Sequence, residues 1–228
     1  MALLHRSTIV PGKLDLAAAW IGRQPWWTGG SDTSLTKPGA FRLDDPEGRV
    51  GIEFIVAGTV SGALLLLPLT YRDAPLEGAE AGLLGTMEHS VLGTRWTYDA
   101  AVDPVALAAV IEVVRTGGTQ AREMIDGPDG PVERVPSVLA HGSVRAAGDG
   151  RTGGTVPVLG IAPASDVVAA SDVVTSSDAV STTVTLPNAQ LVVRRLLDGR
   201  WTPDDATGLL SATWGDVVDV PIVAVRSA

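Results

Sequence analysis

The sequence predicts an α+β protein, with an antiparallel sheet flanked by helices in residues 1–117 and a mostly β second half in residues 136–228. The core must be mainly Val, Leu, Ile and Ala, because only 2 Phe and 2 Tyr accompany 6 Trp in 228 residues, and clustered valines favour strands. One stretch, residues 103–117, has the full pattern of a helix. The composition then shifts toward Val, Thr, Ser and Asp, so we expect short strands beyond a loop or linker at 118–135. Whether the two halves pack as one body stays open.

The N-terminal segment is expected to begin with a short helix at residues 13–21, "KLDLAAAWI". Its Leu14, Ala17 and Ile21 recur at helical spacing after a Pro-Gly start. The helix leads directly into "RQPWWTGG" (residues 23–30), in which a proline and two glycines indicate a turn.

Two strands should follow as a hairpin, formed by residues 40–43 and 50–56 around the charged turn "DDPEG". The second of these alternates apolar residues with Glu53, which predicts a strand with one buried face. Residues 63–72, "ALLLLPLTYR", are apolar enough for the central strand of the same sheet, and Pro68 indicates a bulge or bend there.

A short helix is expected within residues 75–86, a strand at 94–99, and then the clearest helix of the chain. Asp103 occupies the N-cap position of that helix and Pro104 its first turn, while Gly117 ends it. Its apolar stripe consists of Leu107, Val110, Ile111 and Val114.

The bulk properties exclude several classes of function. A formal charge of −9 with a pI near 4.7 argues against nucleic-acid and anionic-membrane partners. The chain has no cysteine, which excludes disulfides, thiolate metal sites and a cysteine nucleophile. Its start lacks a secretory pattern, and its most apolar run (60–69) is shorter than the roughly 20 residues that span a bilayer. We therefore expect a soluble cytoplasmic protein.

Three motifs occur in a fixed order: "WWTGG" (26–30), "LPLTYRDAP" (67–75) and "LLGTMEHSVLGTRWTYDAAVDP" (83–104). In this respect residues 1–117 resemble the N-terminal cap domain of bacterial maltokinases and of stand-alone actinobacterial cap-like proteins. The resemblance implies a small antiparallel sheet flanked by helices and a setting in trehalose, maltose and glycogen metabolism. The positions that carry the family motif are Gly29, Gly30, Tyr71, Trp96, Tyr98, Asp103 and Pro104.

The chain departs from a maltokinase in ways that argue against phosphate transfer. The Trp-Gly-Gly turn continues with Ser31 and Asp32, where the family usually has lysine and arginine. A G-x-G-x-x-G pattern spans residues 148–153, but the catalytic-loop and metal-binding motifs of a kinase are missing from the sequence. The strand that resembles the one carrying the kinase phosphate lysine offers Arg194 and Arg195 instead, and arginine replaces a compact ammonium poorly. We therefore predict no catalytic residues, no cofactor and no ATP-dependent activity.

Other catalytic and metal sites find little support. The three histidines, at positions 5, 89 and 141, have no metal-ligand spacing, and no serine lies in a G-x-S-x-G elbow. We predict no metal site. A six-residue echo, "SDVV" at 165 and 171 and "SDAV" at 177, has too few copies to build a β-helix.

The paired tryptophans, Trp26 and Trp27, allow two interpretations. Buried tryptophans anchor small domains, so at least one is expected in the core. An exposed neighbour can instead stack on a sugar ring, with Asp32, Arg72 and Asp99 as hydrogen-bonding groups. Arg72 and Asp99 each end a strand and can also pair with each other across the sheet.

Three function classes follow, in order of preference. The first is a non-catalytic cap-like protein that binds or regulates a partner in α-glucan, trehalose or maltose metabolism. The second is a small-molecule binder of malto-oligosaccharide at the Trp26/Trp27 turn. The third is a degenerate sugar-kinase-like enzyme. The expected partner is thus a protein or a carbohydrate, and the sequence gives no oligomeric state.

Overall fold

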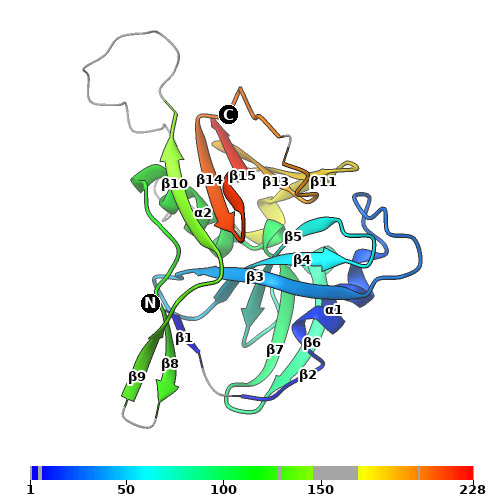
Figure 1. The fold of residues 1–228 in the computed structure, drawn as a ribbon, viewed down its shortest axis with the longest axis vertical. Coiled ribbons are helices and arrows are strands. Elements are labelled where there is room, and N and C mark those ends of the chain that lie inside the picture. The colour runs from blue at the N-terminus through cyan, green and yellow to red at the C-terminus, as the bar shows by residue number, and fades with distance from the viewer. Residues whose placement is uncertain (1, 5–6, 128–129, 146–168, 200, 228) are drawn as a thin grey trace.

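The computed structural model describes residues 2–4, 7–127, 130–145, 169–199 and 201–227, which are dominated by antiparallel strands (Figure 1). Two six-stranded sheets form most of the molecule, and a small third sheet joins β1, β8 and β9. Two α-helices, α1 (Lys13–Ile21) and α2 (Pro104–Thr116), occur among the described residues. The structure is mostly β, so the predicted α+β class is confirmed only in part, while the second half is mostly β as expected.

The first sheet is built entirely from the N-terminal half of the chain, in the order β2-β6-β7-β5-β4-β3. All of its neighbouring pairs are antiparallel, and the predicted hairpin is the pair β3–β4. Its strands are β2 (Ile9–Val10), β3 (Leu35–Leu43), β4 (Gly51–Thr59), β5 (Leu64–Arg72), β6 (Leu83–His89) and β7 (Gly93–Asp99).

Strand β5 joins the first sheet to the second half of the chain. Its pairing with β4 runs without a register shift, so Pro68 causes no bulge there. Strand β7 pairs with β5 along Leu69–Arg72, and a later segment of the chain pairs with the earlier part of β5. Leu66 accordingly donates its backbone N–H to Arg195 at 2.9 Å, and Leu197 donates to Leu64 at 2.8 Å.

The second sheet comes from the C-terminal half, in the order β10-β14-β15-β13-β12-β11, and it is also antiparallel. Figure 1 places it above the first sheet. Its strands are β10 (Leu139–Val144), β11 (Val174–Ser177), β12 (Ser181–Thr185), β13 (Ala189–Arg194), β14 (Gly208–Trp214) and β15 (Val217–Ser227).

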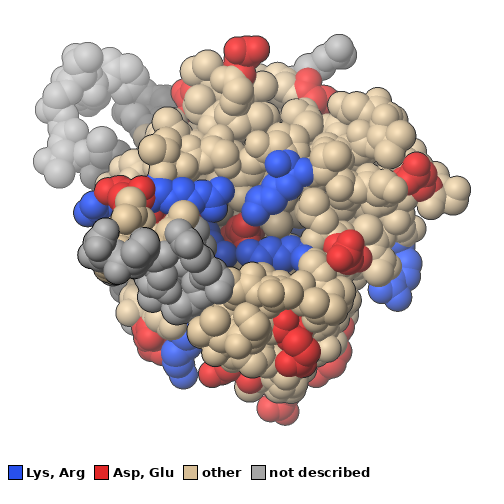
Figure 2. Space-filling model, turned by 60° about the horizontal axis from the view of Figure 1, so that its bottom comes forward, with Lys and Arg blue, Asp and Glu red and all other residues tan. Residues whose placement is uncertain are grey.

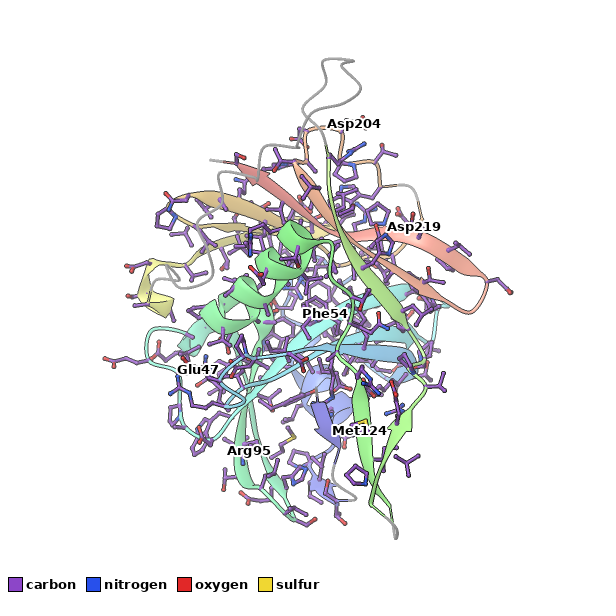
Figure 3. The ribbon with its side chains drawn as sticks, turned by 90° about the vertical axis from the view of Figure 1, so that its left-hand side faces the viewer. Glu47, Phe54, Arg95, Met124, Asp204 and Asp219 are labelled. Carbon is purple, nitrogen blue, oxygen red and sulfur yellow. The ribbon has the colours of Figure 1, made fainter. Side chains whose placement is uncertain are left out.

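The largest core cluster contains residues of both sheets and of α2. Phe54, in its middle, stacks on Phe41 with ring centroids 4.9 Å apart (Figure 3). The apolar stripe of α2 faces the same cluster and includes Leu107 and Val110. The helix lies so close to β10 that a Cβ on Gly142 would come within 2.0 Å of the Val113 carbonyl oxygen. Apolar side chains from the two halves thus pack against one another around α2.

A second core cluster lies on the other face of the first sheet, under α1. It includes Trp20 and Ile21 of the helix and Ile55 and Leu67 of the strands. Because both faces of β4 are covered, the predicted strand with one buried face is wrong: Glu53, on the α1 side, is only 3% exposed. Helix α1 packs on β6 and β3, whereas α2 packs mainly on β10 and β14 of the second sheet. The expected pair of helices flanking the first sheet is therefore not confirmed.

Two shorter segments differ from the sequence expectation. The helix expected within 75–86 is reduced to the 3-10 turn Glu80–Gly82, after which β6 begins, since pairing with β7 takes the following residues. Residues 118–135 hold the hairpin of β8 (Glu123–Gly127) and β9 (Gly130–Arg134), with β1 (Ala2–Leu4) parallel to β8. The division of the chain into domains stays a prediction.

The G-x-G-x-x-G pattern and the first "SDVV" lie outside the described residues. The second copy forms the 3-10 turn Ala170–Asp172 and enters β11, and the third spans the β11–β12 turn. They therefore do not share one structure. Within the described ranges, no helix is both long and apolar enough to cross a membrane.

Candidate functional site

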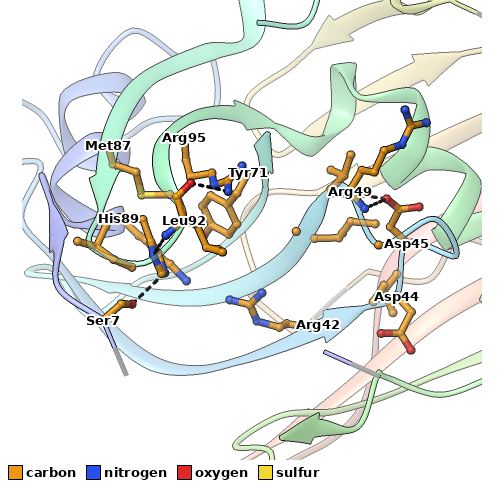
Figure 4. Close-up of a pocket in the computed structure, with 17 residues that line it drawn as sticks. Ser7, Arg42, Asp44, Asp45, Arg49, Tyr71, Met87, His89, Leu92 and Arg95 are labelled. Carbon is orange, nitrogen blue, oxygen red and sulfur yellow. Dashed lines mark hydrogen bonds between the residues drawn. The ribbon is translucent and has the colours of Figure 1, made fainter. Parts of the chain in front are cut away.

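A cavity of about 440 Å³ lies at the edge of the first sheet, beside the first turn of α1 (Figure 4). Strands β3 and β4 with their connecting turn form one side, and β2, β6 and β7 contribute the other. Its charged and polar lining is Ser7, Lys13, Arg42, Asp44, Asp45, Arg49, Tyr71, His89 and Arg95.

Next to this cavity, the buried carboxylate of Glu53 contacts three cationic side chains. Lys13 bonds to the Oε2 atom of Glu53, and Lys37 donates to Oε1 at 2.7 Å. Arg42, directly opposite Glu53 on β3, lies 3.5 Å from Oε2. Tyr71 adds a hydroxyl bond of 2.9 Å to the same oxygen. The two lysines of the chain thus bind one glutamate, and we call these five residues the Glu53 cluster.

The electrostatics of the Glu53 cluster favour an ionised glutamate. Burial alone raises the pKa of Glu53, but the charges of Lys13, Arg42 and Lys37 outweigh it and hold the pKa well below its ordinary 4.5. Burial lowers the pKa of Lys13, against the opposing effect of Glu53. Burial and the Glu53 charge together raise the pKa of Tyr71 well above 10.0, so its hydroxyl stays a donor.

The cluster leaves an excess of positive charge on an acidic protein. Three cations face one carboxylate, and Arg95 adds a fourth cation on the cavity wall. Figure 2 shows Lys and Arg side chains gathered around a hollow on this face, with acidic atoms between them. The local charge of the site is therefore positive, whereas the net charge of the chain is −9.

The β6–β7 side of the cavity contributes Arg95 and His89. Arg95 donates to the Leu92 carbonyl at 2.7 Å, while its buried Nε has no partner among the described residues. His89 accepts from the backbone N–H groups of Val91 and Leu92, and its Nε2 lies 2.9 Å from the Ser7 hydroxyl. The histidine is thus fixed by the turn.

A larger hollow, of about 950 Å³, lies beside the first one and shares Asp44, Asp45, Arg49 and Val50 with it. It runs along α2 and is bordered by Arg72. Among the described residues, no group of three or more Asp, Glu or His side chains is placed to hold a metal ion.

Trp26, predicted as either core or sugar platform, is 1% exposed and packs in the core under α1. Its ring lies 5.8 Å from Trp20, and the guanidinium of Arg195 lies 5.4 Å from its centroid. Arg195 in turn binds Asp99 at 2.5 Å and the Thr182 hydroxyl at 2.8 Å. No ring face of Trp26 is open to a ligand, so this part of "RQPWWTGG" is core.

Trp27 is half-buried and closes its own turn. Its Nε1 donates to the Gly30 carbonyl at 2.8 Å, and Gly30 has a φ of +67°. A Cβ on Gly29 would come within 2.3 Å of the Trp27 ring, so only glycine fits there. Asp32 accepts the backbone N–H of Ser34 at 3.0 Å, which makes it a turn residue. Both glycines are therefore explained by the conformation and packing of the turn.

The predicted pairing of Arg72 with Asp99 is wrong. Arg72 makes a bidentate ion pair with Asp103, with both bonds at 2.7 Å, while Asp99 pairs with Arg195. Asp103 also caps α2 through Val105 N–H at 3.0 Å, with Pro104 in the first turn, as expected. The pairing changes because Asp103 lies next to Arg72 at the helix start.

The remaining motif positions pack or form hydrogen bonds. Tyr98 is buried, and its hydroxyl accepts the backbone N–H of Leu76 at 2.9 Å. Trp96 packs against a small apolar cluster that consists of Ala79, Tyr98 and Ala170. Tyr71 alone among the motif positions belongs to the Glu53 cluster.

The Trp-Gly-Gly turn, the curved first sheet and the capped α2 follow one another in the structure in the same order as the three motifs in the sequence. The family model of the maltokinase N-terminal cap domain matches residues 20–103. This segment, which is less than half of the chain, is similar to that cap domain. It runs from the last turn of α1 through β7 to the cap of α2, and it contains Lys37, Arg42, Glu53, Tyr71 and Arg95 but not Lys13. No match to the chain was found among curated proteins.

The Glu53 cluster was not anticipated from the sequence. The signal that can reveal it is a single glutamate within an apolar strand whose cross-strand neighbour is Arg42, in a chain with only two lysines. The contribution of α1 could not be predicted from the sequence, because Lys13 and Glu53 are 40 residues apart in the chain.

Proposed function

We propose that this chain is a non-catalytic cap-like protein that binds, and thereby regulates, a partner protein of α-glucan, maltose or trehalose metabolism. The match of residues 20–103 to the maltokinase cap domain carries the proposal. It supplies the metabolic setting and the part of a kinase that does not itself transfer phosphate.

The contacts of the arginines and lysines support a role without phosphate transfer. Arg194 and Arg195 stand in the strand that resembles the one bearing the kinase phosphate lysine. Arg195 is 1% exposed and bound to Asp99, and Arg194 bonds to the Leu196 carbonyl and to Asp198. Both lysines are bound to Glu53. Arg194 and Arg195 therefore stabilise the fold at the place where a kinase has a lysine directed at the nucleotide.

An exposed apolar group at the edge of the first sheet suits a protein partner. Val10 of β2 is 62% exposed, and Val91 and Leu92 in the β6–β7 turn are 56% and 45% exposed. Strand pairing of β2 with β6 brings them to the same end of the sheet. Exposed apolar groups of this kind are typical of interaction surfaces.

Affinity purification of the tagged full-length chain from its own cells tests the proposal. We expect an enzyme of α-glucan, maltose or trehalose metabolism to co-purify and to change its activity when the chain is added back. The double variant Val91→Ser/Leu92→Ser should lose this partner, whereas Val60→Ser, which removes a 71% exposed valine elsewhere, should retain it. Recovery of unrelated proteins only, equally by both variants, contradicts the proposal.

A second candidate is carbohydrate binding at the Trp-Gly-Gly turn, favoured by the half-buried ring of Trp27. A thermal-shift titration with maltose and longer malto-oligosaccharides tests it, and saturation at about 100 times Kd adds roughly 2.7 kcal/mol of stability. The shift should vanish in Trp27→Leu, which removes the aromatic face, and persist in Trp201→Leu. Equal shifts in both variants contradict a site on Trp27.

A further inference from the structure

We propose that the cavity bounded by Lys13, Arg42 and Arg95 is a binding site for a small molecule that carries a phosphate group. The inference concerns a ligand site within the cap-like segment and goes beyond the proposed protein partner. It does not depend on which partner is found.

The charge around the cavity is the first reason. In the Glu53 cluster three cations share one carboxylate, and the pKa of that carboxylate is already far below its ordinary value, so Glu53 gains little more from each added cation. Lys13 and Arg42 both line the cavity and are partly exposed there, at 20% and 16% of their side chains. An added dianion offsets the remaining repulsion among them.

The donors available in the cavity are the second reason. Within the described ranges, Arg42 makes one side-chain hydrogen bond, a long contact of 3.5 Å with Glu53. Among the residues that the structure describes, the buried Nε of Arg95 has no hydrogen-bond partner, although its Nη2 donates to the Leu92 carbonyl. A buried guanidinium N–H without an acceptor is costly, and phosphate oxygens match the planar fork of arginine.

The directions of the side chains are the third reason. Figure 4 shows Arg42 pointing to the side on which Tyr71, His89 and Arg95 lie, across the open part of the cavity. The guanidinium of Arg49 points away from them and pairs with Glu47. Arg49 lines the same cavity without belonging to the convergent group, which makes it a matched control.

The acidic side chains that line the cavity do not neutralise the positive charge of Lys13, Arg42 and Arg95. Asp45 accepts three backbone N–H groups, from Glu47, Arg49 and Val50, and serves the β3–β4 turn. In Figure 4 the carboxylate of Asp44 points away from the Arg42 guanidinium. Positive charge therefore dominates the side formed by Arg42 and Arg95.

The size and lining fit a phosphate attached to a compact organic group. Cavities of 300–1,000 Å³ hold small ligands, and this one has about 440 Å³. Its apolar part includes Ile9, Met87 and Leu92, which can contact the rest of the molecule.

Isothermal titration calorimetry of the full chain tests the site with inorganic phosphate and glucose 1-phosphate, and with glucose as the neutral counterpart. We expect both phosphates to bind and glucose alone to give no saturable heat. Arg42→Gln and Arg95→Gln should each weaken binding by roughly 10- to 100-fold, the loss of a charge-assisted hydrogen bond. Arg49→Gln should change it by less than about fivefold, as expected for a surface charge.

Thermal melts and circular dichroism establish whether each variant is folded. If Arg42→Gln does not fold, Arg42→Lys replaces it, because lysine keeps the positive charge beside Glu53. No saturable binding of either phosphate at millimolar concentration overturns the proposal. So does equal binding of glucose and glucose 1-phosphate, or an equal loss in Arg49→Gln and Arg95→Gln. A failed search for a protein partner leaves these outcomes unchanged, so the two proposals are separable.

Discussion

Two buried carboxylates of this molecule have opposite surroundings. Asp99 meets a single guanidinium, that of Arg195, where the first sheet contacts the second half of the chain, and both side chains are less than 10% exposed. Glu53 meets Lys13, Lys37 and Arg42 together, next to a cavity that water can enter.

The difference separates a structural ion pair from a candidate binding site. At Asp99 the charges balance, the Nε of Arg195 donates to the Thr182 hydroxyl, and the ring of Trp26 lies over the guanidinium. At Glu53 three positive charges face one negative charge, and the excess lies beside open volume. Balanced buried charge leaves nothing for a ligand to add, whereas unbalanced charge at a cavity attracts a counter-ion.

Breaking the balanced pair should have the largest effect. Arg195→Met leaves Asp99 buried without its cation, and we expect the free energy of unfolding to fall by about 3–5 kcal/mol. Urea unfolding at pH 7 measures the loss. Arg194→Gln is the matched control, because the adjacent Arg194, although buried, pairs with the partly exposed Asp198, and it should cost less, about 1–2 kcal/mol. Equal losses in the two variants contradict a special role for the Asp99–Arg195 contact.

Removing the carboxylate of the unbalanced site should have a smaller cost in stability. Glu53→Gln leaves three cations facing one another, but Lys37 and Lys13 can turn toward water, so we expect a loss of about 2–3 kcal/mol. Binding of inorganic phosphate should instead strengthen, because the local negative charge is gone. Calorimetry and urea unfolding of the same sample measure both quantities. Weaker phosphate binding in a folded Glu53→Gln protein contradicts the charge argument.

Lowering the pH should show the contribution of the Glu53 carboxylate to stability in the wild-type protein. The pKa of Glu53 is lower in the folded than in the unfolded chain, so its contribution is complete above the ordinary value of 4.5 and is lost as the pH falls below it. Unfolding between pH 7 and pH 3 should show a loss on the order of 1–2 kcal/mol in the wild-type protein that Glu53→Gln lacks. Parallel pH profiles of the two proteins contradict an ionised Glu53.

Local signals account for the parts of the fold that were predicted. The helix at α2 was recognisable because its cap, its proline and its final glycine are consecutive in sequence. The β3–β4 hairpin follows from a charged turn between apolar runs. These features depend on neighbours within a few residues, which the sequence displays directly.

The charged contacts were not predicted because they join distant residues. Arg72 meets Asp103 across 31 positions, and Asp99 meets Arg195 across 96. The alternation around Glu53 indicated a solvent-facing side, but the cover provided by α1 turned that side into a second core. Alternation of polarity shows which residues share a face of a strand, and only the tertiary packing decides whether that face is covered.

The smallest expected effect separates the two lysines of the chain. Lys13 and Lys37 bind the same carboxylate, yet only Lys13 lines the cavity. Lys37→Met, at a side chain 34% exposed, should cost at most about 1 kcal/mol of stability. It should leave the phosphate affinity within about twofold, whereas Lys13→Met should reduce that affinity by about fivefold or more. Both substitutions remove one cation from Glu53, but only Lys13 lines the cavity, so a larger loss of phosphate affinity in Lys13→Met is expected from its position. Equal phosphate affinities in the two variants would mean that the ligand responds to the general charge of this face, and that the Glu53 cluster, like the Asp99 pair, serves the fold alone.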